Sequence, residues 1–187
     1  MASEAAWLSS DKQELAELLL QSHQRAFARP LIAAARPGRS NSKRLLCQEL
    51  FACGFPVLAH GTGNDPKLIY ANAAALQLWE TRWDELIGMP SRLTAPDSER
   101  AERSSALGQA QRLDAVQNYR GLRISRQGRR FMINNAKIWT LWDADQRVGG
   151  QAACFSDWWR LQPPPNPKKN QTSAEEPKPL ASFNHKA

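Results

Sequence analysis

The residue types that most often carry catalysis are sparse and scattered in this sequence. They are three histidines and three cysteines, at His23, His60, His185, Cys47, Cys53 and Cys154. No Ser–His–Asp set, P-loop, nucleophile elbow or paired-carboxylate motif can be assembled from neighbouring residues. We therefore expect a protein that is not an enzyme.

The cysteines indicate neither a metal site nor a disulfide framework. Cys47, Cys53 and His60 match no zinc spacing, and no fourth ligand follows within range. Cys154, between an alanine and a phenylalanine, is typical of a small core residue, which we favour over a redox role. Cysteines so few and so irregularly spaced favour a reducing cytosol.

A run of arginines could bind an anion or nucleic acid through its guanidinium groups. It comprises Arg120, Arg123, Arg126, Arg129 and Arg130, of which Arg120, Arg123 and Arg130 are the expected anion contacts. Strand alternation divides the run between two faces, and no aromatic residues interleave as in a stacking platform. We favour a solvated sheet edge with ion pairs to Asp97, Glu99 or Glu102. Nucleic-acid association is the weakest alternative.

The tryptophans fall into two groups. Trp79 and Trp83 belong to predicted helices in the middle of the chain, where they line a pocket or fill a core, and we favour packing. Trp142, Trp158 and Trp159 lie at the ends of predicted strands. Paired tryptophans just before a proline-rich segment suggest an exposed surface for a partner or a second copy.

Capping and periodicity predict helices in the first half of the chain. Asp11-x-x-Glu14 begins a helix with an apolar stripe from Leu15, and Ser42 caps a second over 43–53. Strands 55–60 and 68–71 form a hairpin. Asn72 caps a helix over 73–80, and boxes at Thr81 and Thr94 begin two more, the last reaching Gln109.

The second half changes to a period of about two. Strands are expected over 118–126, 129–142 and 148–158, separated by turns. On the middle strand Phe131, Ile133, Trp139 and Leu141 share one parity, so we expect them on one face. The fold class is α+β, a five-stranded antiparallel sheet with a helical insert on one face, preceded by N-terminal helices.

Composition sets the domain organisation. With 187 residues and 42% hydrophobic content the chain can bury one modest core. Residues 1–54 are expected to pack as helices on a core formed by 55–160, and the proline-rich tail 161–187 to be disordered. The net charge of +7 is spread along the chain. No stretch is apolar enough to span a bilayer, so no membrane association is expected.

Two sets of motifs resemble known families. "IYANAAALQLW" and "DELIGM" resemble the strand–Asn–helix and E-L-x-G features of PAS domains. "YRGLRISRQGRRFMINNAKIWTLWD" and "GGQAACFSDW" resemble the MEKHLA domain, a PAS-related module over about Leu15 to Trp159. That module is found at the end of class III homeodomain–leucine zipper regulators of plants, and it also forms small stand-alone proteins of cyanobacteria and algae. The resemblance implies a PAS-like sensory or regulatory module, whose cofactor stays unknown.

The sequence disfavours two cofactors that PAS-like domains bind. Haem ligation from the insert needs a histidine between Ala71 and Arg160, and none is present. A flavin–cysteine adduct needs a cysteine in the insert helices, where there is none. The cofactor is therefore left open, and the partner is expected to be a small molecule or a protein.

We expect the ligand pocket between the sheet and the helices from Ala73 to Leu107. Its polar contacts would be Asn135, by parity, or Asn134, because an amide at mid-strand needs a partner. The full set of expected ligand-binding residues is Asn135, Asn134, Trp79, Trp83, Phe131, Ile133, Trp139 and Cys154. The alternative is an assembly module, forming a homodimer or docking a partner, with the pocket filled by its own side chains.

Overall fold

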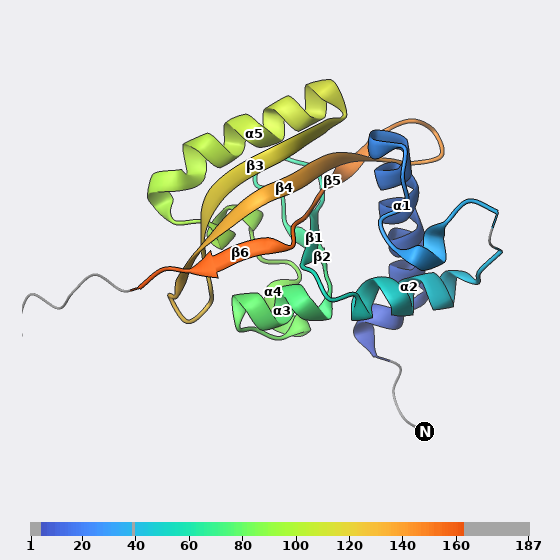
Figure 1. The fold of residues 1–187 in the computed structure, drawn as a ribbon, viewed down its shortest axis with the longest axis horizontal. Helices are drawn as coiled ribbons and strands as arrows, with labels where there is room; N and C mark the ends of the chain where they lie inside the picture. Colours follow the sequence, from blue (N-terminus) through green and yellow to red (C-terminus); the bar gives the residue numbers. More distant parts are fainter. Residues whose placement is uncertain (1–4, 39, 163–187) are drawn as a thin grey trace, which may run out of the picture.

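The computed structural model describes residues 5–38 and 40–162 (Figure 1). The expected tail, 161–187, lies outside the described residues except for its first two positions. No helix in the described ranges is both long enough and apolar enough to cross a membrane.

The N-terminal region is a helical layer. It contains the short 3-10 turns η1 (Ala6–Leu8) and η2 (Ala33–Ala35) and the α-helices α1 (Ser10–Phe27) and α2 (Lys43–Ala52). The Ser42 hydroxyl accepts from the backbone N–H of Leu45, so the predicted cap of α2 is confirmed. α1 packs against α2 and against the sheet.

A buried asparagine joins this layer to the first hairpin. Strands β1 (Val57–His60) and β2 (Leu68–Ala71) pair antiparallel, and Asn72 follows them, fully buried. Its Oδ1 accepts from the N–H groups of Val57 (2.9 Å) and Ala75 (3.1 Å), and its Nδ2 donates to Phe55 O (2.8 Å). The predicted cap is therefore confirmed, and the same amide also fixes the start of β1.

The insert consists of α3 (Ala73–Trp79), α4 (Trp83–Leu86), the 3-10 turns η3 (Ser91–Thr94) and η4 (Asp97–Glu99), and α5 (Arg100–Leu113). Two predicted helix starts are wrong. α4 is capped at Arg82, because Glu85 accepts from both the Thr81 hydroxyl (3.0 Å) and the Arg82 N–H (3.3 Å). Thr94 donates to Ser91 O (2.7 Å) inside a 3-10 turn, so α5 begins later.

The second half supplies the remaining strands, β3 (Ala115–Ile124), β4 (Arg130–Trp142), β5 (Val148–Cys154) and β6 (Asp157–Arg160). The antiparallel sheet has the order β2-β1-β5-β4-β3, and β6 pairs with the first part of β4. The sheet therefore has six strands rather than five. The predicted strand 148–158 is divided at Phe155 and Ser156, which lie between β5 and β6.

Two asparagines create matched bulges in the β3–β4 pair. The register passes from Val116↔Ile138 to Tyr119↔Ala136 to Gly121↔Ile133, which places one extra residue on each strand in turn. Asn118 and Asn135 have φ of 58° and 50°, a left-handed conformation that asparagine tolerates better than most residues. After Asn135 the alternation of β4 is reversed.

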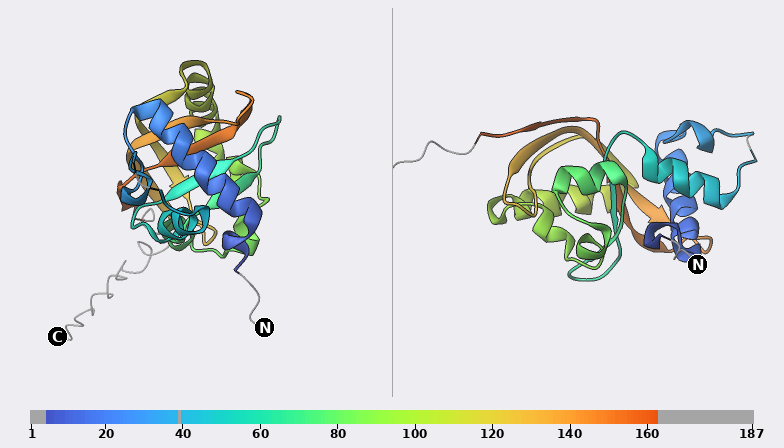
Figure 2. Two further views of the ribbon diagram at one scale, coloured as in Figure 1. Left: turned by 90° about the vertical axis from the view of Figure 1, so that its right-hand side faces the viewer. Right: turned by 90° about the horizontal axis from the view of Figure 1, so that it is seen from below.

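The sheet has a hydrophobic core on each face. The inner core packs against the insert and includes Phe131, Ile133 and Ile138, whereas the outer core packs against α1 and α2 and includes Trp139 and Leu141. Figure 2 shows the insert and the N-terminal helices as separate groups around the curved sheet. The prediction that Phe131, Ile133, Trp139 and Leu141 share a face is wrong, because the bulge at Asn135 lies between the two pairs.

Candidate functional site

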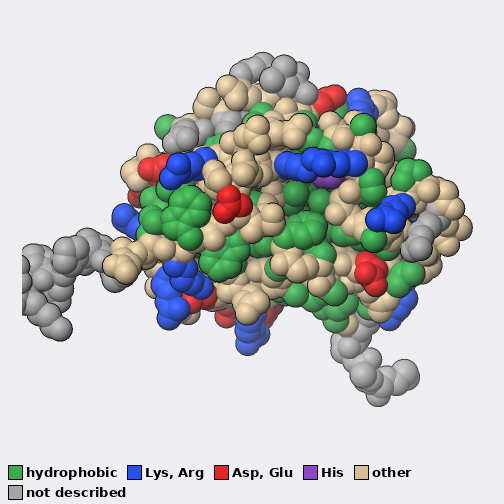
Figure 3. Space-filling view, viewed as in Figure 1, with side chains coloured by type: hydrophobic (Ala, Val, Ile, Leu, Met, Phe, Trp, Pro, Cys, Tyr) green, Lys and Arg blue, Asp and Glu red, His purple; other side chains and the backbone are tan. Residues whose placement is uncertain are grey.

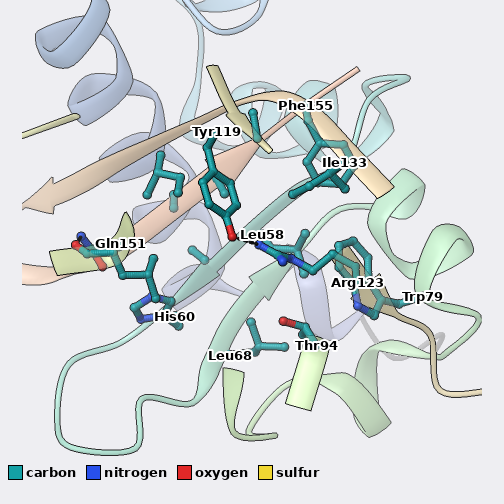
Figure 4. Close-up of a pocket in the computed structure, with 16 residues that line it drawn as sticks. Leu58, His60, Leu68, Trp79, Thr94, Tyr119, Arg123, Ile133, Gln151 and Phe155 are labelled. Atoms are coloured by element: carbon teal, nitrogen blue, oxygen red, sulfur yellow. Dashed lines mark hydrogen bonds between the residues drawn. The ribbon is translucent and has the colours of Figure 1, made fainter. Parts of the chain in front are cut away.

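A cavity of about 50 Å³ lies between the insert and the inner face of the sheet (Figure 4). All of the described strands except β6 contribute to one wall, and α3, η3 and α5 supply the other. Most of the lining is aliphatic or aromatic. The polar side chains on it are Thr94, Tyr119, Arg123, Gln151 and His60.

Arg123 extends across this cavity toward Tyr119 (Figure 4). Only 6% of its surface is exposed. Its Nη1 donates to Leu122 O (2.7 Å) and its Nη2 donates to the Tyr119 hydroxyl (3.2 Å), whose ring centroid lies 5.3 Å from the guanidinium carbon. No carboxylate among the described side chains pairs with it. A guanidinium keeps its charge when buried, and burial without a counter-charge is costly.

The alternation of β3 places Tyr119, Gly121 and Arg123 on the inner face together. Gly121 permits the contact between its two neighbours. A Cβ at this position would stand 2.5 Å from the Tyr119 hydroxyl oxygen and 2.9 Å from Arg123 Nη1. The absence of a side chain at Gly121 therefore leaves the space in which the Tyr119 hydroxyl and the Arg123 guanidinium meet.

Trp79, the last residue of α3, contributes an unpaired donor to the same region. Its side chain lines the cavity and is 2% exposed, and its Nε1–H has no hydrogen-bond partner among the described residues. Its ring packs edge-on against Phe131 at 5.0 Å between centroids. Burying an N–H without an acceptor is unfavourable, so this ring adds an unsatisfied donor to the buried charge of Arg123.

Gln151 and His60 lie at the other end of the cavity (Figure 4). Gln151 Nε2 donates to Leu107 O (2.8 Å), which ties β5 to α5. His60 Nδ1 lies 2.8 Å from Gly61 O and donates to it. These side chains are held by the backbone around them. The strongest electrostatic feature of the cavity is therefore Arg123, and the arrangement is suited to a negatively charged hydrogen-bond acceptor.

Comparison with known proteins identifies the family. The MEKHLA domain family matches residues 13–160. This chain belongs to the MEKHLA domain family. No curated protein matches it closely enough to be counted.

Solved structures show that the MEKHLA domain has the PAS fold. A PAS domain of a protein from Colwellia psychrerythraea superposes with a TM-score of 0.55 at 10% identity, covering 61% of this chain and 94% of that one. An RNA-binding light-oxygen-voltage receptor gives 0.53 at 20% identity over 68% of this chain and 34% of that one. A light-oxygen-voltage domain from a study of flavin analogues gives 0.50 at 14%, over 63% and 85%. At these identities the likeness concerns the fold alone.

Three of the predicted ligand-binding residues of the MEKHLA domain lie at or beside the cavity. Trp79 and Ile133 line it, and Phe131 packs behind Trp79 in the inner core. Asn134 lies on β4, where its Nδ2 donates to Asp157 (2.6 Å), so its amide is used to join β6 to the sheet.

The other predicted ligand-binding residues do not line this cavity. Asn135 is exposed at the bulge and lines a separate outer hollow of about 260 Å³ together with Cys154. Trp139 is on the outer face, where its Nε1 donates to Leu19 O in α1 (3.3 Å). Trp83 packs on Tyr70 in the outer core, 5.9 Å between centroids. The bulge explains the positions of Asn135 and Trp139.

Cys154 has the environment of a core residue. It is 6% exposed, and burial raises its pKa to about 12. Such a thiol is not deprotonated at neutral pH and is a poor nucleophile. The interpretation of Cys154 as a packed side chain therefore fits its surroundings.

The arginine run is divided more completely than the sequence suggests. Arg120 faces outward over the Trp159 ring, 5.4 Å from its centroid, and Arg130 is exposed. Arg129 pairs with Glu80 (2.8 Å) instead of the expected acids. The expectation of a solvated edge is wrong for Arg123, which is buried. The alternating pattern Tyr119–Gly121–Arg123 on a predicted strand is the signal that could have located it.

The three candidate partner-surface tryptophans do not form one patch. Trp158 and Trp159 are 38% and 39% exposed, but adjacent strand residues face opposite sides, and Trp158 contacts the ring of Phe131. Trp142 lies at the far end of β4, beneath Arg25 at 4.8 Å. Hydrophobic surface with basic side chains beside it is visible over β6 in Figure 3.

Proposed function

We propose that this MEKHLA domain is a sensory binding module rather than an enzyme, and that its signal is a small molecule held in the cavity at Arg123. The observation that carries the proposal is the buried guanidinium, which faces a cavity and has no described carboxylate partner. The PAS fold supports it, because ligands of such a fold would lie between insert and sheet, where this cavity is. The expectation of a reducing cytosol rests on three free cysteines.

Native mass spectrometry of the protein purified from its own host tests this proposal. We expect a bound small molecule that is released on denaturation. Ala136 lines the cavity and is fully buried, so Ala136→Leu should fill part of the space and lower ligand retention. Ala101→Leu on the exposed face of α5 is the matched control and should retain the molecule. A parent protein that elutes without any adduct, and whose unfolding midpoint is unchanged by host extract, contradicts the proposal.

Assembly through the edge of the sheet is the second candidate. It is favoured by the exposure of Trp159 on β6, a strand that pairs only with β4 among the described strands. If this surface holds a second copy, light scattering will show a dimer that Trp159→Asp dissociates. Leu93→Asp is the control, because Leu93 is exposed to nearly the same extent, 38%. A monomer at all concentrations removes this candidate.

A further inference from the structure

We infer that the ligand of the Arg123 cavity is a small monocarboxylate with a short apolar substituent. This inference rests on the proposed function and specifies its ligand class. The carboxylate would pair with Arg123, and the substituent would lie among aliphatic side chains of β1 and β4 such as Leu58, Ile133 and Ile138.

Charge is the first argument for an anion. Arg123 is almost fully buried, and its hydrogen-bond partners, a carbonyl and a hydroxyl, are both neutral. Glu80, at the end of α3, does not compensate it, because that carboxylate accepts from Ser125 (2.6 Å) and pairs with Arg129 and Arg160. A neutral ligand would leave the buried charge uncompensated, whereas one carboxylate matches one guanidinium in charge and in geometry.

Hydrogen-bond donors give a second, independent argument. Trp79 Nε1–H is buried at the cavity with no partner in the described chain. The Tyr119 oxygen already accepts from Arg123, so its own proton can be donated elsewhere. A group with several acceptor lone pairs and no proton satisfies all of these donors together, and a carboxylate has two such oxygens.

Size and polarity restrict the anion further. A cavity needs a volume of about 10–15 Å³ to hold one water molecule. The volume of about 50 Å³ found here therefore accommodates a group of only a few non-hydrogen atoms. The remaining walls are largely apolar, which favours a carbon substituent over the additional oxygens of a phosphate or a dicarboxylate. Acetate and propionate have the required size and charge.

The test is a calorimetric titration of the intact protein with a fixed panel of probes. Formate, acetate, propionate and butyrate vary the substituent, acetamide and propionamide remove the charge, and sodium chloride and sodium nitrate supply anions with no carbon chain. We expect acetate or propionate to bind most tightly and the amides to bind about tenfold more weakly or not at all. Amides that bind as well as the acids, or inorganic anions that bind as well as propionate, overturn the inference.

Two arginines on the same strand provide a matched pair of variants. Arg123→Met keeps an unbranched side chain, although a shorter one, and removes the charge inside the cavity. Arg120→Met is the matched control, because it makes the same change at an exposed charge on the opposite face. We expect propionate affinity to fall about tenfold or more in the first and to stay unchanged in the second. Equal affinity in both variants contradicts the assignment. Tyr119→Phe, which retains the charge, should weaken binding by a smaller factor, and it keeps the test valid if Arg123→Met does not fold.

Native mass spectrometry separates failure of this inference from failure of the proposed function. A neutral molecule bound to the host-purified protein and displaced by Ala136→Leu would leave the sensor proposal standing and overturn the carboxylate assignment. No bound molecule, together with no response to any carboxylate in the panel, would overturn both.

Discussion

Arg123 and Tyr119 meet through a single hydrogen bond of 3.2 Å, from Nη2 to the phenolic oxygen, above Gly121 on the inner face of β3. The contact is possible only because no side chain occupies position 121. The two polar groups at this end of the cavity thus come from one short stretch of β3.

Gly121→Ala should disturb the cavity while preserving the fold. The new methyl group would push against the buried ring end of Tyr119 and the guanidinium of Arg123. We therefore expect the free energy of unfolding to fall by about 1–3 kcal/mol. Propionate affinity should fall severalfold. Gly149→Ala is the control, because its Cβ would meet ordinary contacts at 3.8 Å. Parent-like calorimetry for Gly121→Ala would show that the Arg123–Tyr119 contact has no part in binding.

Trp139→Ala should destabilise the protein by about 3 kcal/mol or more. Trp139 is fully buried, donates to Leu19 O and packs edge-on against His23 at 5.0 Å between ring centroids. Chemical denaturation measures the change, and Trp159→Ala, an exposed tryptophan, should cost less than about 1 kcal/mol. Similar losses in the two variants would contradict the burial of Trp139 against α1.

Asn135→Leu should destabilise the fold by about 1 kcal/mol, because a leucine is strained at the φ of 50° found here. Asn135→Gly should be neutral or slightly stabilising, since glycine adopts this conformation freely. The sequence predicts Asn135 as a polar contact of the ligand in the pocket. The structure reverses this expectation, so propionate titration should give parent-like affinity in both variants. A more stable Asn135→Leu protein would disprove the bulge.

His23 should make stability depend on pH between about 4 and 6.5. Its Nδ1 donates to Arg29 O, its Nε2 is buried without a partner, and burial lowers its pKa from 6.5 to about 4. The hydrogen bond to Arg29 O opposes this lowering of the pKa, whereas the charges of Lys137 and Arg29 add to it. In this window the unfolded chain binds the proton and the folded chain does not, so stability is complete above pH 6.5 and falls as the pH is lowered to 4. The loss is on the order of 2 to 3 kcal/mol.

Urea denaturation at intervals across this pH range measures the dependence. His23→Gln can still donate to Arg29 O and does not titrate, so its slope between pH 5 and 6.5 should be flat, although the variant is less stable overall. A slope in His23→Gln equal to that of the parent would assign the dependence to other groups.

Local signals in the sequence predicted the elements well where the cause is local. Ser42 and Asn72 cap their helices as expected because a side-chain oxygen three residues before an orphan N–H suffices. The bounds of β4 agree within one residue, since alternation and flanking turns mark them. The starts of α4 and α5 were missed because the two threonines make other local bonds. The Thr81 hydroxyl donates to the Glu85 carboxylate, and the Thr94 hydroxyl donates to Ser91 O, so neither acts as the predicted cap.

The site was predicted less well because its geometry depends on two strands at once. A bulge is a property of the register between β3 and β4, and no pattern within β4 alone reveals that Asn135 reverses its alternation. Arg123 was named as an anion contact, but its burial depends on the insert that covers it and on the small residue at 121. Such arrangements follow from tertiary packing rather than from propensity.

Consecutive residues of β4 belong to the two sides of the molecule. Ile138 forms part of the cavity wall, and Trp139 is hydrogen-bonded to Leu19 O in α1. One peptide unit therefore connects the wall to the helical layer, with no flexible segment between them. Trp139 is fully buried in a close-packed environment. It therefore has no free space into which it could move if the cavity wall at Ile138 were displaced. We therefore expect a displacement of β4 at Ile138 to shift the contact between Trp139 and α1 as well.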